Sequence, residues 1–264
     1  MRIRLLQLLV LVVCLLAWGI LTDPRVPAIY FDNPDKAAFF FGQPLEVADR
    51  LVRWFVSGEI YRHLWVTLVE TLLAFAAGTV GGVAVGLWLG LAPTASAIFD
   101  PYIKALNAMP RVILAPIFMV WFGLGIGSKV ALGFTLVFFI VFFNVYQGVR
   151  EVSPDVLASA RMLGANRRQL LQHVFVPSAL SWVFASLHNS VGLAFVGAVV
   201  GEYLGSAEGV GYLIHQAEGV FDIDSVFAGI VLLTIFALLL DGAVSLMEKR
   251  LMVWQPRSAG GERL

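Results

Sequence analysis

The chain has 264 residues, of which 59% are hydrophobic and 14% are charged, and its mean hydropathy is +0.84. Soluble domains carry about 25% charged residues, so this composition excludes an ordinary soluble domain and predicts a polytopic membrane protein. Lysines plus arginines and aspartates plus glutamates both number 18, which gives a net charge of zero and no basis for nucleic-acid binding. The single cysteine excludes an internal disulfide and a cysteine-based metal site.

Six apolar segments are long enough for a helix to cross a bilayer, which takes about 20 residues. The first follows the basic start MRIR and has no small-residue cleavage site after it, so an uncleaved helix is favoured over a signal peptide. The sequence therefore predicts an all-α, polytopic membrane protein with about six transmembrane helices. The segments comprise residues 5–21, 64–91, 102–124, 130–149, 179–204 and 226–247.

The predicted organisation has four parts along the chain. We expect a first transmembrane helix over residues 1–22, an extracytoplasmic loop over 23–63, a transmembrane core over 64–247 and a cytoplasmic tail over 248–264. Within the loop, residues 45–56 have the pattern of an amphipathic helix that lies at the membrane surface.

The distribution of charges predicts that both termini are cytoplasmic, because lysines and arginines gather on the cytoplasmic side of membrane proteins. The loop between the fourth and fifth segments is basic, whereas loop 205–225 contains acidic residues and no lysine or arginine. Loop 23–63 disagrees with this arrangement, since it lies outside but mixes acidic with basic residues. Its basic residues are Arg25, Lys36, Arg50, Arg53 and Arg62.

Small residues recur at every fourth position along the second apolar segment. This spacing lets two helix backbones approach closely, and glycines otherwise weaken a helix. We therefore expect tight packing against a neighbouring helix, with a helix of the same chain favoured over a second copy. The small residues are Ala74, Gly78, Gly82, Gly86 and Gly90.

Two prolines, Pro110 and Pro116, interrupt the third apolar segment. Proline removes a backbone hydrogen bond and kinks a helix, and such breaks persist in membranes only against protein or water. Arg111 beside the first break either lines a pathway or reaches the inner membrane boundary. Because polar residues in spans mark pathways or interhelical contacts, we predict that Asn107, Arg111 and Asn189 line a translocation path.

No sequence motif supports catalysis by this chain. The stretch GLGIGSK at 123–129 lacks the residue order of a phosphate-binding loop, so we expect a tight turn in which Ser128 caps the next helix. His188, Ser190 and Asp241 include the residue types of a hydrolytic triad, but their spacing does not favour one. We therefore expect no enzyme activity, cofactor or metal, and any nucleotide energy must come from a partner chain.

The basic segment 150–177 has the pattern of two short amphipathic helices. The tripeptide SPD at 153–155 is a helix start, with serine as the cap, proline in the first turn and an acid that favours the helix dipole. We expect Gly164 to end this helix, Asn166 to cap a second one, and Pro177 to end the second helix at the membrane. Each helix carries an apolar stripe, so the segment either packs under the membrane domain or docks a soluble partner.

The stretch ASARMLGANRRQLLQHVFVP at 158–177 resembles the EAA loop of bacterial ABC importer permeases. Ala160 matches the second alanine of that loop, Gly164 matches its glycine, and Pro177 follows at the required distance. Ala158 stands where the pattern has glutamate, and Ser159 replaces the first alanine. The stretches LNAMPRVILAPIFMVWFGLGIGSK, GEYLGSAEGVGYLI and LMVW resemble the nitrate, sulfonate and taurine branch of these permeases, so the similarity covers about residues 60–254.

This resemblance implies a type I ABC importer permease in the bacterial inner (plasma) membrane. Its implied partners are two copies of an ABC ATPase subunit, a periplasmic solute-binding protein and a second permease copy, with membrane lipid around them. The loop would couple the ATPase to alternation of the permeases between inward-open and outward-open states. The expected coupling residues are Leu157, Ala160, Gly164, Ala165 and Arg168.

The identity of the solute and two rival classes of function stay open. The resemblance implies nitrate, a sulfonate or taurine, or alternatively a pyrimidine precursor of thiamine. Taurine-type relatives typically have arginine where this chain has Asn107. A passive channel or secondary transporter would transport without partners, and a structural scaffold would not transport. Glu202 and the acidic loop 208–224 either contact the binding protein or, as we prefer, form a solvated surface.

Overall fold

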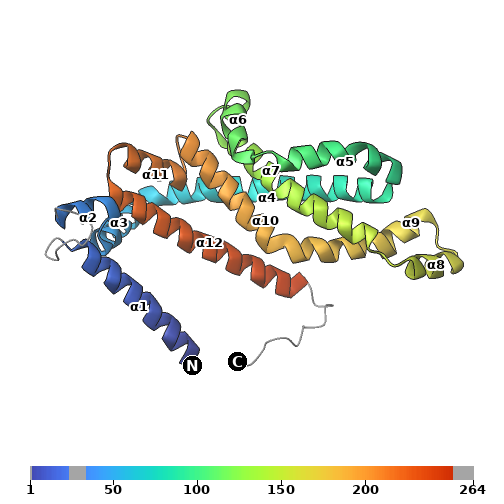
Figure 1. The fold of residues 1–264 in the computed structure, drawn as a ribbon, viewed down its shortest axis with the longest axis horizontal. Coiled ribbons are helices and arrows are strands. Elements are labelled where there is room, and N and C mark those ends of the chain that lie inside the picture. The colour runs from blue at the N-terminus through green and yellow to red at the C-terminus, as the bar shows by residue number, and fades with distance from the viewer. Residues whose placement is uncertain (1, 24–33, 252–264) are drawn as a thin grey trace. The chain divides into compact units, whose positions relative to one another are not determined.

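The computed structural model describes residues 2–23 and 34–251, and no strand occurs in these ranges. Arg25 and the predicted tail from residue 252 onward lie outside the described residues. Figure 1 labels the α-helices along the chain. The helices are α1 Arg2–Thr22, α2 Pro34–Phe41, α3 Pro44–Ser57, α4 Glu59–Leu91, α5 Pro93–Ala108, η1 Arg111–Leu114, α6 Ala115–Phe122, α7 Ile126–Arg150, α8 Pro154–Met162, α9 Arg167–Leu170, η2 Leu171–Phe175, α10 Val176–Leu204, α11 Val210–Gly219 and α12 Ile223–Leu251.

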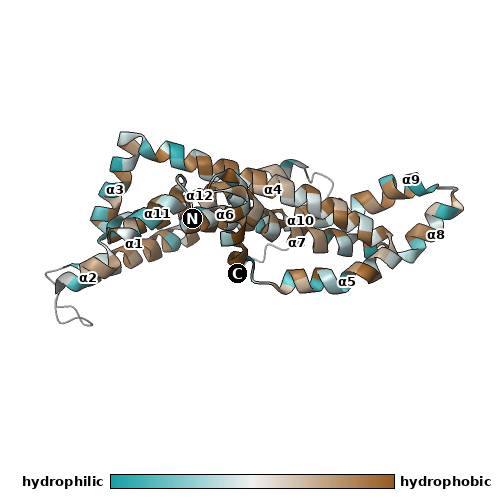
Figure 2. Cartoon of the chain, turned by 90° about the horizontal axis from the view of Figure 1, so that it is seen from above, coloured by the Kyte–Doolittle hydropathy of each residue, from teal (hydrophilic) through white to brown (hydrophobic). Residues whose placement is uncertain are grey.

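Four of these helices, α1, α4, α7 and α12, are each long and apolar enough to cross a membrane. Two bent pairs raise the number of candidate spans to six, in agreement with the predicted fold class. The third expected segment is broken, because η1 and α6 turn by 86° from α5 at Met109 and Pro110. Figure 2 shows hydrophobic residues along the long helices and more hydrophilic ones on α3, α8 and α9.

The described residues divide into two compact units, and α4, α7, α10 and α12 contribute to both. Unit 1 holds α1 to α3, the start of α4, α6, the start of α7, the end of α10, α11 and the first half of α12. Unit 2 holds α5, α8, α9 and the remaining parts of the shared helices. Their bounds are Met1–Glu70, Val112–Leu132 and Gly197–Phe236 for unit 1, and Thr71–Arg111, Gly133–Val196 and Ala237–Leu264 for unit 2.

In unit 2, a row of glycines on α4 faces a row of buried valines on α7. A Cβ atom placed on any of these glycines lies closer to the opposing valine Cβ than real Cβ atoms approach. The prediction that the small-residue stripe packs on a helix of the same chain is therefore confirmed. The pairs, with the distance between the two Cβ atoms, are Gly78–Val137 at 2.6 Å, Gly82–Val141 at 2.8 Å, Gly86–Val145 at 2.8 Å and Gly90–Val149 at 2.9 Å.

In unit 1, α3 packs its apolar face against α4, α11 and α12. Val47 and Trp54 of α3 are buried in one cluster with Ile60, Leu213 and Leu232. The predicted helix over residues 45–56 is therefore present and buries one face, while its position at the membrane surface stays a prediction.

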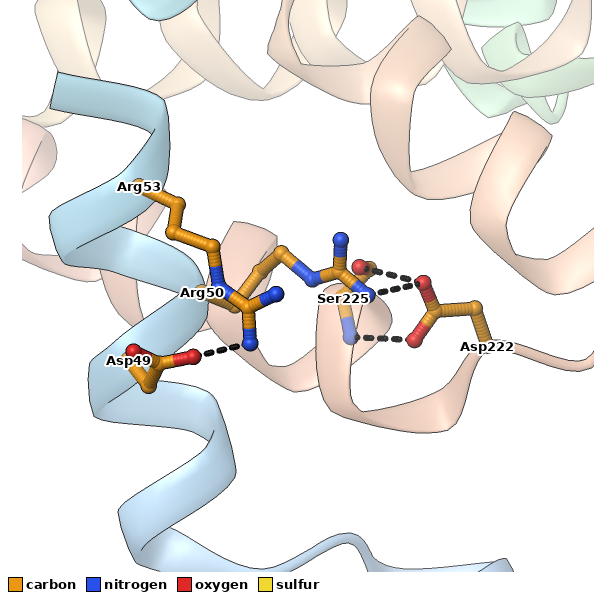
Figure 3. Close-up of polar contacts among 5 residues, drawn as sticks. All are labelled: Asp49, Arg50, Arg53, Asp222 and Ser225. Carbon is orange, nitrogen blue, oxygen red and sulfur yellow. Dashed lines mark hydrogen bonds and ion pairs between the residues drawn. The ribbon is translucent and has the colours of Figure 1, made fainter. Parts of the chain in front are cut away.

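Three of the basic residues that disagreed with the charge distribution, Arg50, Arg53 and Arg62, are paired with acids in unit 1. Figure 3 shows Arg50 of α3 reaching Asp222, which also accepts hydrogen bonds from Ser225 at the start of α12. The Arg50–Asp222 pair spans 2.8 Å, and Arg62 pairs with Glu208. Loop 23–63 and loop 205–225 therefore meet at one end of unit 1, where their charges offset each other.

Two local expectations are wrong. Ser128 does not cap α7, because that helix already begins at Ile126 and the Ser128 hydroxyl donates to the carbonyl of Gly125. Pro177 does not end a helix, because the chain stays helical from α9 through η2 into α10. A wide π turn precedes the proline, in which the N–H of Val176 donates to the carbonyl of Leu171, and this wider turn accommodates a ring that clashes in a regular helix.

Candidate functional site

Local capping sets the shape of segment 150–177. The Ser153 hydroxyl accepts a hydrogen bond from the N–H of Asp155 at the start of α8. Asn166 and Gln169 form a capping box at the start of α9, in which each side chain accepts from the backbone N–H of the other residue. These contacts satisfy N–H groups that a helix start leaves unpaired, and they confirm both predicted helix starts.

Gly164 makes the bend between α8 and α9. Its φ of +82° lies in the left-handed region, which glycine adopts without the steric cost of a Cβ. The N–H of Gly164 donates to the carbonyl of Arg161, and the N–H of Ala165 donates to that of Ala160. This pair of bonds is a Schellman motif, so the prediction that Gly164 ends the first helix is confirmed.

The most exposed apolar residues of this segment lie at the bend. Leu157, Ala160 and Ala165 are half-buried, whereas Gly164 and Arg168 are exposed. Two further residues, which sequence reasoning did not select as coupling residues, offer most of the apolar area: Met162 is 82% exposed and Leu163 is 89% exposed. Their position directly before Gly164 could have indicated this exposure, because residues next to a bend between two helices are often exposed.

A cavity of about 520 Å³ lies in unit 2 beside the end of α7, where segment 150–177 begins. Tyr146 and Arg150 of α7 line it together with Ser96 and Asp100 of α5. The hydroxyls of Ser96 and Tyr146 are 2.6 Å apart, and the Arg150 guanidinium donates to the Tyr146 hydroxyl. This polar network joins the end of α7 to the start of α5.

Two of the three predicted path residues are in contact. Arg111 donates to the side chain and to the carbonyl of Asn107, and its guanidinium lies 4.8 Å from the centre of the Phe139 ring of α7. The break at Pro110 thus places a cation against an aromatic face, an arrangement that stabilises a partly desolvated charge. Asn189 is exposed on α10.

Glu202 lies in a buried polar cluster of unit 1, so the preferred interpretation of a solvated surface is wrong for this residue. It is fully buried, and it accepts hydrogen bonds from the Thr67 hydroxyl at 2.6 Å and from the N–H of Gly211 at 2.8 Å. The N–H of Gly209 donates to His63, and that of Val210 donates to Thr67. Side chains of α4 and α10 therefore cap α11 from outside, with a carboxylate at its positive end.

Two glycines of GEYLGSAEGVG, Gly209 and Gly211, lie where a side chain would collide with Glu202 or with the backbone of α10. A Cβ on Gly209 would lie 2.1 Å from Cδ of Glu202, and a Cβ on Gly211 would lie 2.5 Å from the carbonyl oxygen of Val199. Glu70 and Lys129 are also buried in unit 1, and the Lys129 ammonium donates to the carbonyl of Leu124. Sequence reasoning missed this cluster, although the paired glycines marked it. In the described residues, no group of three or more acidic, histidine or cysteine side chains is arranged to hold a metal ion.

Comparison with known families and proteins agrees with this architecture. The family model described as "Binding-protein-dependent transport system inner membrane component" matches residues 78–253. The taurine transport system permease protein TauC of Escherichia coli is 30% identical over 81% of this chain and 80% of its own length. The formylaminopyrimidine transport permease protein ThiX of Halalkalibacterium halodurans is 34% identical over 83% of this chain and 87% of its own. The riboflavin transport system permease protein RibX of Chloroflexus aurantiacus is 32% identical over 83% and 81%.

Solved structures share the fold. A chain of the MetNI methionine ABC transporter in an inward-facing conformation superposes with a TM-score of 0.63 at 19% identity, over 72% of this chain and 95% of that one. A chain of an amino acid ABC transporter with histidines superposes with a TM-score of 0.57 at 19% identity, over 74% and 98%. The described helices therefore have the arrangement of an ABC importer permease.

Proposed function

Because the chain belongs to the family of binding-protein-dependent transport system inner membrane components, we propose that it forms the translocation path for a small solute delivered by a binding protein. The chain is a multi-pass membrane subunit of an ABC importer. In the proposal, two cytoplasmic ATPase subunits hydrolyse ATP, and a second copy of the chain completes the permease pair. Segment 150–177 transmits the movement of the ATPases to the membrane helices.

The exposed bend of segment 150–177 carries this proposal. Met162 and Leu163 are the kind of exposed apolar residues that mark a protein contact, and Arg168 adds a cation beside them. Leu157 and Ala160 are half-buried on α8, while Gly164 and Ala165 provide the bend. Capping at the starts of α8 and α9 stabilises both helices, and a segment that transmits movement needs such stable helices.

The proposed orientation places this bend in the cytoplasm and loops 23–63 and 205–225 outside, with both termini cytoplasmic. The Arg50–Asp222 and Arg62–Glu208 pairs support it in two ways. They place the two loops at the same end of unit 1. Two loops that both lie outside the membrane must be at the same end. They also neutralise Arg50 and Arg62, two of the basic residues that conflicted with the preference of positive charge for the cytoplasmic side.

The relatives suggest three classes of solute. They are a sulfonate such as taurine, a pyrimidine of the formylaminopyrimidine type, and riboflavin; nitrate has no support among the relatives described above. Asn107 and Arg111 lie together at the break after α5 and are proposed to line the path. Arg111 suits an anionic group, since a guanidinium donates hydrogen bonds in a fork that matches sulfonate oxygens.

The test replaces Met162 or Leu163 by glutamate in the complex reconstituted with its ATPase and binding protein. A buried, unpaired charge at the docking surface should lower solute-stimulated ATP hydrolysis by at least about tenfold, while the chain still inserts and melts normally. Gln172→Glu is the matched control, because it adds the same charge at an exposed position of η2.

Unchanged stimulation in both glutamate variants contradicts the docking assignment. Transport by the chain alone in liposomes, without ATP or partners, indicates a channel or secondary transporter instead. A chain that assembles with its partners but supports no transport is a scaffold.

A further inference from the structure

His188 of α10 and Asp241 of α12 form a polar pair in unit 2 that none of the roles above uses. Nδ1 of His188 lies 2.9 Å from Oδ1 of Asp241. Asp241 is the one charged residue in the apolar stretch 225–247 of α12, and His188 lies near the start of the straight apolar part of α10, Ser186–Leu204. The pair therefore joins two candidate spans.

Both side chains of this pair are open on the surface of the chain. The Asp241 side chain is 62% exposed and that of His188 is 36% exposed. An ionisable side chain in a span is unfavourable against lipid, and such residues face water-filled cavities or other polar surfaces. An exposed carboxylate in this stretch thus indicates a surface that water reaches.

Space for a small group adjoins the pair. A cavity of about 40 Å³ is lined by His188, Asp241, Gly192 and Phe195 together with further apolar residues. A Cβ placed on Gly192 meets no atom within 4 Å, so the cavity continues into open space on that side. The site has one carboxylate, one imidazole and an aromatic wall, which are typical parts of a small-molecule site.

We propose that Asp241, positioned by His188, is a solute-contact site on the translocation path and is complementary to N–H groups. This inference rests on the proposed function and adds to it a chemical class of solute. A carboxylate accepts hydrogen bonds from ammonium, amino or ring N–H groups and repels anions. The ammonium of taurine and the amino group of an aminopyrimidine share this chemistry, and a simple alkyl sulfonate lacks it.

Cysteine labelling tests whether the pair faces water. The full chain with Cys14→Ser as background carries Asp241→Cys or Gly192→Cys and is exposed in membranes to a charged, membrane-impermeant methanethiosulfonate. Gly192→Cys leaves the pair intact and keeps the test valid should Asp241→Cys fail to fold. Leu239→Cys is the control, because this residue is 66% exposed but points about 160° away from Asp241 around α12.

We expect labelling at positions 241 and 192 that is at least about tenfold faster than at position 239. Equal, slow labelling at all three positions overturns the inference, because the pair then faces lipid or a packed interface. Disulfide crosslinking of Asp241→Cys between two copies of the chain, without labelling, also overturns it in favour of a contact between copies.

Uptake tests the solute class in the reconstituted complex with taurine, formylaminopyrimidine and ethanesulfonate as probes. We expect ATP-driven uptake of either taurine or formylaminopyrimidine, and a loss of about tenfold in that uptake in Asp241→Asn and in His188→Leu. His188→Asn, which retains an N–H donor for Asp241, should restore most of the uptake. Whether taurine or formylaminopyrimidine is taken up then shows which of the two classes of solute the transporter carries.

Unchanged uptake in Asp241→Asn overturns the inference while leaving the proposed function intact, as does uptake of ethanesulfonate alone. If the wild-type complex shows no ATP-driven uptake of any probe, both the proposed classes of solute and the proposed solute contact at Asp241 are wrong. The labelling result still decides whether the pair faces water.

Discussion

Glycines serve opposite purposes in the α4–α7 contact of unit 2 and in the bend of segment 150–177. At Gly82 the backbone has ordinary helical angles, but there is no room for a side chain. An added Cβ would lie 2.8 Å from Cβ of Val141 and 2.9 Å from the carbonyl oxygen of Phe138. At Gly164 the space is open, with no atom within 4 Å of an added Cβ, and the constraint is the φ of +82°.

This difference separates residues that hold the fold from residues that shape a working surface. Substitution on α4 pushes two helices apart and therefore acts on folding. Substitution at Gly164 changes a local angle on an exposed segment and therefore acts on the contact that the segment makes. Melting temperature and coupling should respond independently in the two regions.

The largest effect is expected for Gly82→Val. Three added carbons have no room against α7 and must displace backbone atoms of Phe138 and Phe142, so we expect a loss of about 3 kcal/mol or more and a poor yield of folded chain. Melting in detergent, followed by tryptophan fluorescence, measures it. Gly242→Ala on α12 is the control, because that Cβ meets nothing within 4 Å and alanine favours a helix. Equal melting of the two variants would show that α4 and α7 are not in tight contact.

Gly209 combines both constraints and should follow in size. Its φ is +106° and its ψ is 163°, a region that is essentially restricted to glycine, and an added Cβ would overlap the Glu202 carboxylate, so Gly209→Ala should lower stability by about 3 kcal/mol or more. In a Glu202→Ala background the overlap is gone and only the backbone strain, at least about 1 kcal/mol, remains. A double-mutant cycle on melting measures this difference. Additive effects of the two substitutions would contradict the packing of Gly209 on Glu202.

Most features set by local sequence were predicted, with Ser128 and Pro177 as exceptions, whereas the partners of distant segments were not. Ser153, Gly164 and Asn166 act through backbone groups within a few residues, so turn chemistry alone located them. The burial of Glu202 depends on Thr67 of another helix, and no spacing within the motif reveals that partner. The stripe on α4 revealed a contact but not the valines that complete it. The prediction for Pro177 was wrong because proline ends or kinks a regular helix, whereas here a π turn precedes the proline and accommodates its ring.

Gly164→Ala should affect coupling more than folding. The left-handed conformation costs alanine about 1–2 kcal/mol, which is paid within an exposed bend, so the melting temperature should change little. Solute-stimulated ATP hydrolysis in the complex should fall several-fold, because Met162 and Leu163 shift with the bend. Gly164→Asn is the matched control, since asparagine tolerates this conformation better, and Gly164→Asp should lose transport through its added charge. A large drop in melting temperature for Gly164→Ala would contradict the claim that Gly164 affects coupling while the glycines of α4 affect folding.

The smallest effect is expected for Asn166→Ala, which removes one half of the capping box while leaving Gly164 in place. The N–H of Gln169 loses its acceptor at 2.9 Å, and loss of such a cap costs about 1 kcal/mol. Because α9 is a short helix of four residues, this loss frays its start and loosens the second arm of the bend. Amide hydrogen exchange at residues 167–170 should accelerate by about fivefold, with a twofold decrease in stimulated ATP hydrolysis. Asn166→Asp keeps an acceptor at the cap and should exchange at the original rate, so acceleration in both variants would assign the effect to the amide group and not to capping.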